Sequence, residues 1–170
     1  SVLKKGGNRS ISVIESINQS VSNYSSRLKH RNISVDICCN ESIGDILCDK
    51  RILITMLMNI IDNSIYWLDT IYKIEKRIYF NVERMNGNVS ILIIDNGPGF
   101  RDSTEDVVSP FFSWKYGGIG IGMYLIDTVM IQYGKLNVIH DKVYLKEKNI
   151  PEIFDGAAVE LIFNNKQYDW

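Results

Sequence analysis

The hydrophobic positions at the start of the chain follow a helical pattern. Apolar side chains recur every three or four positions from Ile14 to Leu28, which is the spacing that places them on one face of a helix. Ser12 and Glu15 precede most of that pattern with the spacing of a capping box. The pattern therefore predicts one amphipathic helix over about residues 11–29.

A second helix is predicted after a short strand. The strand is the segment ISVDICC, residues 33–39. Asp49 is then placed to cap a helix that continues to about Ile71. Because the segment from Ile52 to Leu68 is apolar on almost every side, most of this helix is expected to be buried.

The C-terminal half predicts four strands and a third helix. RIYFNVE and VSILIID alternate as strands around the turn MNGN, which is a good hairpin signal. The third helix is expected to open within PFFSWKYGGIGIGMYL and to reach about Gln132, followed by strands at KLNVIHDKVYL and AAVELIF. Helices and strands interleave without a strict strand-helix-strand repeat. We therefore expect an α+β fold in two layers, with a mixed sheet and helices on one face.

Three polar residues in the apolar helix need an explanation. Asn59, Asp62 and Asn63 lie in the middle of it. Short polar side chains disfavour a helix interior, and burying one without a partner costs about 1 to 3 kcal/mol. We therefore expect a ligand to bind at this stretch.

Composition excludes several classes of protein. The chain has 170 residues, 45% of them hydrophobic and 23% charged, which fits one soluble domain. A formal net charge of -1 gives no broad basic field for nucleic acid, and no stretch is apolar enough to span a membrane. The first residue is Ser1 rather than methionine, so we expect a piece of a longer protein.

The cysteines argue against a zinc site. Cys38, Cys39 and Cys48 form no CxxC pair and have no histidine cluster beside them. We interpret them as buried thiols in a reducing compartment, which places the chain in the cytoplasm.

Two glycine motifs are ambiguous when each is taken alone. GGIGIG places Gly118, Gly120 and Gly122 at a spacing that is neither the dinucleotide fingerprint nor a phosphate loop. Glycines just before a helix expose N–H groups to phosphate oxygens, but a flexible turn explains them equally well. DNGPGF, from Asp95 to Phe100, could likewise be a tight turn that Asp95 caps.

The order of these motifs is more specific. Asn59-x-x-Asp62-Asn63 on a helix, DNGPGF after a strand, and PFFSWK with GIGIGM before a helix together resemble the GHKL superfamily. This group contains histidine kinases, type II topoisomerases, gyrase-like heat-shock chaperones and MutL. The resemblance is closest to the catalytic and ATP-binding (HATPase_c) domain of sensor histidine kinases. It implies one ATP-binding domain over residues 1–170 with the Bergerat fold, and an ATP lid at about residues 100–118.

The resemblance implies roles for the polar residues of the apolar helix. Asn63 matches the asparagine whose oxygen holds Mg²⁺, which in turn bridges the phosphates of ATP; oxygen is the ligand that this cation prefers. Asn59, one turn earlier, is expected to support the phosphates and the metal and to take part in catalysis. Asp62 points elsewhere and is either a residue that supports the site from behind or a surface residue.

Further roles follow for the motifs beyond this helix. Asp95 matches the aspartate that accepts a hydrogen bond from the adenine amino group, and Gly97 and Gly99 let the backbone approach the base. In the lid, Lys115 is expected to reach the terminal phosphate and to assist catalysis. The resemblance also implies that Phe111 and Phe112 pack the lid against the body, and that three glycines hinge the lid and cradle the phosphates: Gly118, Gly120 and Gly122.

The chain departs from the family in two places. Relatives often carry lysine and tyrosine where Tyr66 and Trp67 stand, so Lys115 is left to carry more of the charge. Trp67 either stacks on the base or fills the core behind the helix. Ala157 and Ala158 occupy positions where many relatives have a hydroxyl near adenine.

The function that the resemblance implies is a histidine kinase catalytic domain that presents Mg-ATP. The acceptor is then a histidine on a helical dimerisation domain, upstream or in another protein, because neither His30 nor His140 lies in an acceptor-like sequence. A response regulator is expected downstream, with no nucleic acid and no direct membrane contact, although the parent protein could be membrane-anchored. The alternative is a GHKL ATPase or chaperone-like switch driven by the nucleotide. The hypothesis of a pseudokinase that only binds nucleotide has less support, because the residues expected at the phosphates are present.

Overall fold

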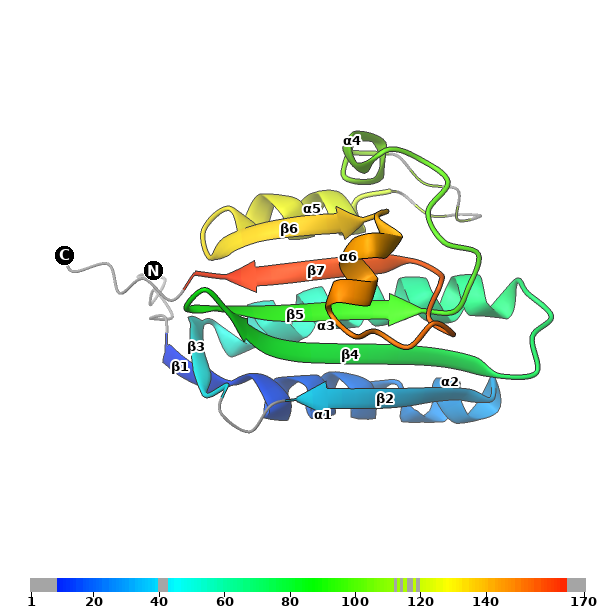
Figure 1. Cartoon of the computed structure of the whole chain (residues 1–170), viewed down its shortest axis with the longest axis horizontal. Helices are drawn as coiled ribbons and strands as arrows, with labels where there is room; N and C mark the ends of the chain where they lie inside the picture. The colour runs from blue at the N-terminus through cyan, green and yellow to red at the C-terminus, as the bar shows by residue number, and fades with distance from the viewer. Residues whose placement is uncertain are drawn as a thin grey trace, which may run out of the picture.

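The computed structural model describes residues 9–39, 43–111, 113, 115, 118 and 120–164. Its main sheet has five strands in the order β2-β4-β5-β7-β6 (Figure 1). Strand β2 is parallel to β4, and the other neighbours are antiparallel. The strands are β2 Ile33–Cys39, β4 Lys76–Met85, β5 Asn88–Asp95, β6 Gly134–Ile139 and β7 Ala158–Phe163.

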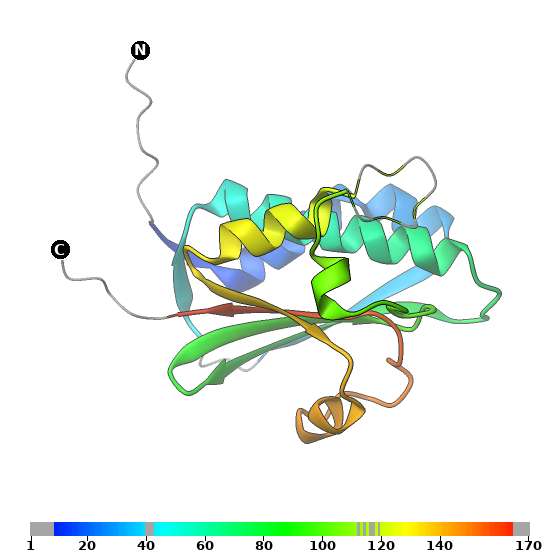
Figure 2. The same cartoon turned by 90° about the horizontal axis from the view of Figure 1, so that it is seen from above.

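A layer of helices covers one face of this sheet (Figure 2). The three longest of them are α1 Val13–Asn23, α3 Lys50–Asp69 and α5 Gly122–Met130. The α+β fold class predicted from the sequence, with a mixed sheet and a helical layer, is therefore confirmed. Among the described residues, no helix is both long enough and apolar enough to cross a membrane.

The N-terminal helix differs from its prediction. It begins at Val13 after a short strand, and it is divided at Tyr24 into α1 and α2 Ser25–His30. Tyr24 has φ -106° and ψ 7°, which is outside helical geometry. The predicted cap is confirmed, because Ser12 Oγ accepts a hydrogen bond from the backbone N–H of Glu15 at 3.3 Å.

A second, two-stranded sheet was not predicted. It pairs β1 Arg9–Ser12 with β3 Asp45–Cys48 in antiparallel register. Asp49, directly after β3, caps α3 as expected and accepts from the N–H of Arg51 at 2.9 Å. The cysteine prediction holds only in part, since Cys48 is buried but Cys38 is exposed.

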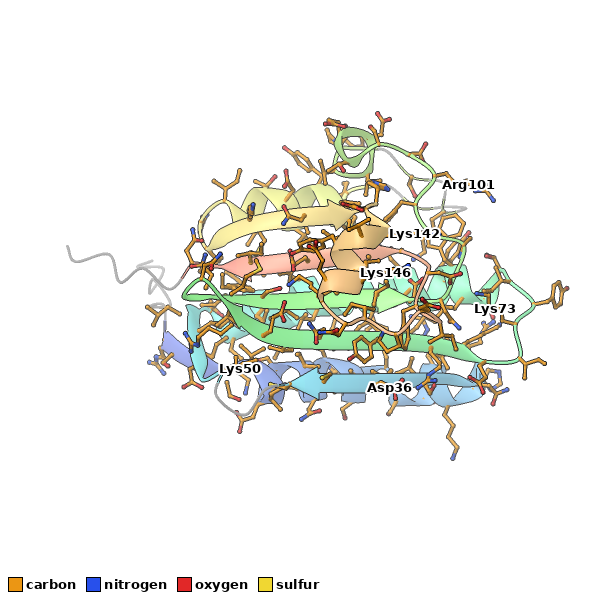
Figure 3. The ribbon with its side chains drawn as sticks, viewed as in Figure 1. Asp36, Lys50, Lys73, Arg101, Lys142 and Lys146 are labelled. Atoms are coloured by element: carbon orange, nitrogen blue, oxygen red, sulfur yellow. The ribbon has the colours of Figure 1, made fainter. Side chains whose placement is uncertain are left out.

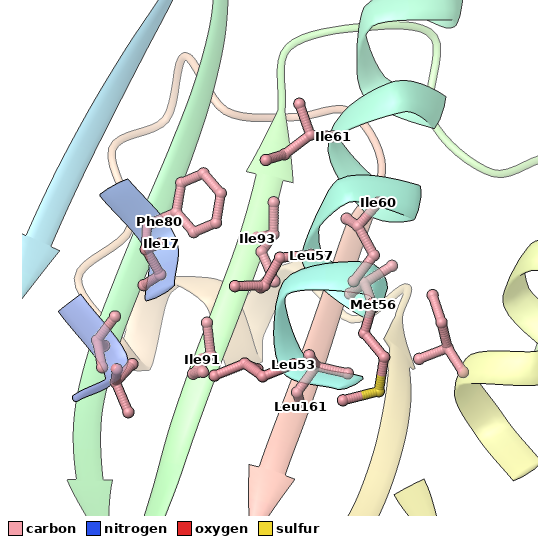
Figure 4. Close-up of a cluster of buried hydrophobic side chains, with 14 of the residues drawn as sticks. Ile17, Leu53, Met56, Leu57, Ile60, Ile61, Phe80, Ile91, Ile93 and Leu161 are labelled. Carbon is pink, nitrogen blue, oxygen red and sulfur yellow. The ribbon is translucent and has the colours of Figure 1, made fainter. Parts of the chain in front are cut away.

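The core lies between the helical layer and the sheet (Figure 4). Alternate residues of β4 and β5, such as Phe80, Ile91 and Ile93, point into it, and the two isoleucines lie beside Leu53 and Leu57 of α3. All five side chains are at most 1% exposed. This packing fixes α3 against β5, and so holds its polar residues near the end of that strand.

The last predicted strand before β7 ends early. Only residues up to Ile139 are in β6; the chain then forms α6 Lys142–Glu147, which Asp141 caps, and crosses to the opposite face of the sheet (Figure 2). Lys142 and Lys146 of α6 lie on that face (Figure 3). We call residues 140–157 the back-face segment.

A buried charge anchors the back-face segment. Glu160 of β7 is fully buried and accepts hydrogen bonds from the hydroxyls of Ser90 and Tyr144 at 2.8 and 2.9 Å. Lys148 Nζ lies 3.2 Å from it and also contacts Glu83. Burial acts to raise the pKa of Glu160, but these hydrogen bonds and the lysine charge outweigh it and hold that pKa below its usual value.

Candidate functional site

A cavity of about 560 Å³ lies between α3, the end of β5 and the segment after it. Five of the residues that the sequence singled out line it: Asn63, Trp67, Asp95, Gly99 and Lys115. The others, Asn59, Gly97, Gly118, Gly120 and Gly122, are not among its lining residues. Apolar side chains form much of its wall, including Ile60, Ile71, Ile93, Met123 and Val159. The cavity is thus apolar with a few polar groups, which is typical of a small-molecule site.

Asp95 forms the polar end of the cavity and is 1% exposed. Its Oδ1 accepts hydrogen bonds from the backbone N–H groups of Gly97 at 2.9 Å and Ala157 at 3.1 Å. Its Oδ2 is buried and makes no hydrogen bond with any part of the chain that the structure describes. An unpaired buried oxygen is costly, so this atom fits a ligand that donates an N–H, as the amino group of adenine does.

Burial also affects the protonation of this carboxyl group. It raises the pKa of Asp95, and the N–H groups of Gly97 and Ala157, which bind Oδ1, act in the opposite direction. The hydroxyl of Ser64 acts in the same direction as these N–H groups, because it lies near the carboxylate, but it does not form a hydrogen bond of normal geometry with Oδ2. Sequence reasoning did not single out Ser64, which is buried and lines the cavity. Its position directly after Asn63 was the available signal.

Gly156 is a second residue that the sequence reasoning missed. A Cβ at this position would lie 2.2 Å from Asp95 Oδ1 and 2.6 Å from the nitrogen of Gly97. Its N–H also donates to the backbone oxygen of Asp95 at 2.9 Å. Only glycine therefore lets the end of the back-face segment approach the aspartate this closely.

We expect Gly156→Ala to lower the affinity for adenosine about tenfold, because the new methyl group must displace Asp95 or the segment that supports it. Calorimetric titration with adenosine measures this. Gly87→Ala is the control, because Gly87 does not line the cavity and a Cβ there meets nothing within 4 Å, although its φ of +82° strains an alanine. Unchanged adenosine affinity in Gly156→Ala would show that this close approach does not shape the site.

The remaining glycines fit close contacts in several ways. Gly99 and Gly120 have φ of +78° and +73°, a region that favours glycine. At Gly118 a Cβ would lie 2.7 Å from Ser113 Oγ, and at Gly122 it would lie 3.4 Å from Asn59 Oδ1. The contact at Gly118 is too short for a side chain, whereas the distance at Gly122 is close to an ordinary van der Waals contact.

The polar stripe of α3 is divided between two environments. Asn63 lines the cavity, whereas Asn59 donates from Nδ2 to the backbone oxygen of Thr55 at 3.0 Å. Trp67, on the same stripe, is half-buried, lines the cavity and meets Tyr66 edge to face with ring centroids 5.1 Å apart. Trp67 is thus available to contact a flat ligand, as one of its two predicted roles requires.

Another part of the cavity wall carries positive charge. Lys115 Nζ lies 2.6 Å from Asp62 Oδ2, and Arg27 Nη1 lies 2.7 Å from Asp62 Oδ1. Burial acts to raise the pKa of Asp62, but the hydrogen bonds from the lysine and the arginine outweigh it and hold that pKa below its usual value. Asp62 is therefore an anion that joins two cations.

One predicted contact of the lid is wrong. Phe111 is 75% exposed, so it does not pack the lid against the body. Its positive φ of 64° turns the backbone so that its N–H donates to the oxygen of Gly120 at 3.0 Å. The matching prediction for Phe112 lies outside the described residues.

The residues present fit a magnesium ion only if the nucleotide supplies further ligands. Within the described ranges, no group of three or more histidine, cysteine, aspartate or glutamate side chains could hold a metal. Asn63 offers one amide oxygen at the cavity wall. Magnesium commonly binds through one or two protein oxygens together with substrate phosphates and water, and this arrangement agrees with that pattern.

The sequence matches known proteins across this site. A family model described as "Histidine kinase-, DNA gyrase B-, and HSP90-like ATPase" matches residues 48–163. The sensor histidine kinase ZraS of Salmonella typhimurium is 25% identical over 130 residues, which cover 74% of this chain and 27% of ZraS. The probable C4-dicarboxylate sensor kinase of Bacillus subtilis is 30% identical over 84 residues, or 48% of this chain and 16% of that protein.

Solved structures show the same fold. The catalytic domain of histidine kinase ThkA has a TM-score of 0.75 at 18% identity, covering 94% of this chain and 98% of that one. The mycobacterial sensor histidine kinase MprB has a TM-score of 0.69 at 18% identity, covering 92% and 96%. The architecture expected from the resemblance is therefore confirmed. The chain spans about a quarter of the length of ZraS.

Proposed function

This chain belongs to the family of histidine kinase-, DNA gyrase B- and HSP90-like ATPases, and we propose that it is the ATP-binding catalytic domain of a sensor histidine kinase. The observation that carries the proposal is the buried, unpaired Oδ2 of Asp95 at the end of an otherwise largely apolar cavity. An adenine amino group supplies the missing donor. The apolar walls and Trp67 suit the flat faces of the base.

The other end of the site is suited to phosphates. We assign Asn63 to the metal and the phosphates, and Lys115 to the terminal phosphate. Gly122 begins α5, whose first turn has no side-chain cap, so its backbone N–H groups suit an anion. Magnesium supplies positive charge to the phosphates when it is bound. Holding the nucleotide in this orientation is the main task of such a domain, because phosphoryl transfer depends on positioning and charge neutralisation.

The phosphoryl acceptor is assigned to a histidine outside this chain. His30 ends α2 and His140 follows β6, and neither lines the cavity. A helical, histidine-containing dimerisation domain is the partner that the family suggests, and a cytoplasmic location is consistent with that role. One structural neighbour is histidine kinase ThkA in complex with the response regulator protein TrrA. By analogy we propose a response regulator as the next phosphate acceptor.

The nature of Asn59 favours a kinase over an ATPase switch. In the members of the superfamily that hydrolyse ATP, a glutamate at this position serves as general base. An amide does not accept a proton at neutral pH, and a general base is worth about 10² to 10⁴ in rate. A histidine nucleophile brings its own lone pair and does not need that base.

We therefore expect the chain alone to bind Mg-ATP, to release phosphate very slowly and to leave itself unphosphorylated. Adding the helical domain encoded with it should yield an acid-labile phosphohistidine. Radiolabelled ATP with acid and base treatment of the product distinguishes this bond from a phosphoester. Brisk phosphate release by the chain, with no phosphoprotein on adding that domain, would support the nucleotide-driven switch instead.

A further inference from the structure

Two side chains of α3 hold Lys115 at the edge of the cavity. Its Nζ lies 2.6 Å from Asp62 Oδ2 and 4.9 Å from the centroid of the Tyr66 ring. Asp62 and Tyr66 are four residues apart and so lie on one stripe of the helix. The neighbouring stripe carries Asn59 and Asn63. The ammonium group is therefore beside the residues assigned to the metal and the phosphates.

Helix α3 carries no cation of its own beside the cavity. Its only basic residues are Lys50 and Arg51, in its first turn. Positive charge at this end must come from another element, and Lys115 is one of two cations among the cavity-lining residues, with Arg101. A flexible lysine loses rotamer entropy when it binds a ligand, so contacts that restrain it beforehand improve binding.

The ring of Tyr66 is suited to restrain a lysine without neutralising it. The aromatic face attracts the ammonium group through its quadrupole and carries no charge. The carboxylate of Asp62 adds a stronger tie, but it also brings a negative charge close to the site. Arg27 binds the other oxygen of that carboxylate at 2.7 Å. Two cations and one anion leave one positive charge facing the nucleotide.

We propose that Tyr66 and Asp62 are positioning residues for Lys115 in the ATP site, and that Arg27 offsets the charge of Asp62 so that the lysine still attracts the terminal phosphate. This inference rests on the proposed function. It assigns a role to the tyrosine that replaces the basic residue of many relatives, and it connects α2 to the phosphate end of the cavity.

Tyrosine variants test the cation–π contact. We expect Tyr66→Leu to lower Mg-ATP affinity about threefold to tenfold, because the ammonium group loses the aromatic face. Tyr66→Phe keeps that face and should bind ATP nearly as the wild type does. Adenosine affinity, which does not involve the phosphates, should be equal in all three proteins. Calorimetry with both ligands gives these values.

A double-mutant cycle shows whether Tyr66 acts through the lysine. In a Lys115→Met background, Tyr66→Leu should cause no further loss of ATP affinity. Lys146→Met is the matched control for the lysine, because Lys146 lies on α6 on the opposite face of the sheet (Figure 3). Tyr72→Leu is the control for the tyrosine, because Tyr72 is fully exposed in the α3–β4 loop.

Arginine variants test the charge balance. Arg27→Gln should lower ATP affinity about twofold to fivefold and leave adenosine binding unchanged. Without the arginine, the negative charge of Asp62 offsets the positive charge of Lys115. Arg31→Gln is the control, since Arg31 pairs with Asp69 instead.

The outcomes separate this inference from the proposed function. A wild-type chain without Mg-dependent ATP binding overturns both. If the wild type binds Mg-ATP, the inference alone is overturned when Tyr66→Leu binds ATP as tightly as the wild type, when Tyr66→Phe loses as much as Tyr66→Leu, or when the loss persists without Lys115. The inference is supported if three results agree. Tyr66→Leu lowers the affinity for ATP but not for adenosine, Tyr66→Phe binds ATP as the wild type does, and Tyr66→Leu has no further effect in the Lys115→Met background.

Discussion

Asp95→Asn is expected to lower the affinity for both ATP and adenosine by about tenfold to 150-fold, the range for losing a hydrogen bond to a charged group. The two backbone N–H groups that bind Oδ1 will retain the amide oxygen of the new side chain at that place. The amide NH₂ then takes the place of Oδ2 and presents donors to the cavity. An adenine amino group meets a donor where it needs an acceptor.

The exchange also makes a prediction about base preference. Guanine has a carbonyl oxygen where adenine has its amino group, so Asp95→Asn should lose much of its preference for ATP over GTP. Calorimetry with both nucleotides measures the ratio, and Asp36→Asn on the edge strand β2 serves as the matched control (Figure 3). Equal binding of ATP and GTP by the wild type would refute the adenine assignment of Asp95.

The same carboxyl group should make adenosine binding sensitive to pH. Because burial raises the pKa of Asp95, its acceptor form is lost at a higher pH than for an ordinary aspartate as the solution is acidified. Affinity should therefore fall as the pH drops through that raised pKa. The same raised pKa means that ionising this carboxyl group costs stability in the protein without ligand. The cost grows as the pH rises from the unfolded-state pKa to the raised folded-state pKa, and it is constant above that.

Asn63→Ala is expected to remove the metal-dependent part of ATP affinity and to slow phosphoryl transfer to the helical domain about a hundredfold or more. The substitution removes the amide oxygen that we assign to magnesium, and with it a preorganised group beside the reacting phosphate. Adenosine affinity should not change, because adenosine has no phosphates. Titrations with and without magnesium, together with single-turnover transfer rates, measure the two effects.

Two variants sharpen that test. Asn63→Asp keeps an oxygen ligand and should retain a dependence on magnesium. Asn23→Ala, at the end of α1, removes an exposed asparagine away from the cavity and should leave both measurements unchanged. If Asn63→Ala responds to magnesium as the wild type does, the metal is held by other groups.

Local signals explain which elements could be predicted from the sequence. Ser12 and Asp49 were identified as caps because a cap depends on residues a few positions away. The helix and strand periods of the core were visible for the same reason. The strand predicted over residues 135–145 is confirmed as far as Ile139 and is wrong beyond it, because KVYL continues an alternating pattern, although Asp141 before Lys142 was a cap signal.

Contacts between distant parts of the chain explain what was missed. The residues of β1 and β3 are too few to give a periodic pattern, and their pairing joins segments far apart in the sequence. Gly156 gave no local sign that it lies against Asp95. Asp62 was interpreted as pointing away from the ligand, and its ion pair with Lys115 depends on how the segment after β5 folds back over α3.

The support of Asp95 from the back-face segment restricts which parts of this domain can be exchanged with relatives. The backbone N–H groups of Gly156 and Ala157 donate to Asp95, while Lys148 binds the same segment to Glu160 of β7. A chimaera that receives a foreign loop between β6 and β7 but keeps its own DNGPG turn would combine a loop and a turn whose contacts do not match. The loop and the turn should therefore be transplanted together, and natural insertions should collect between β6 and α6 rather than beside Gly156.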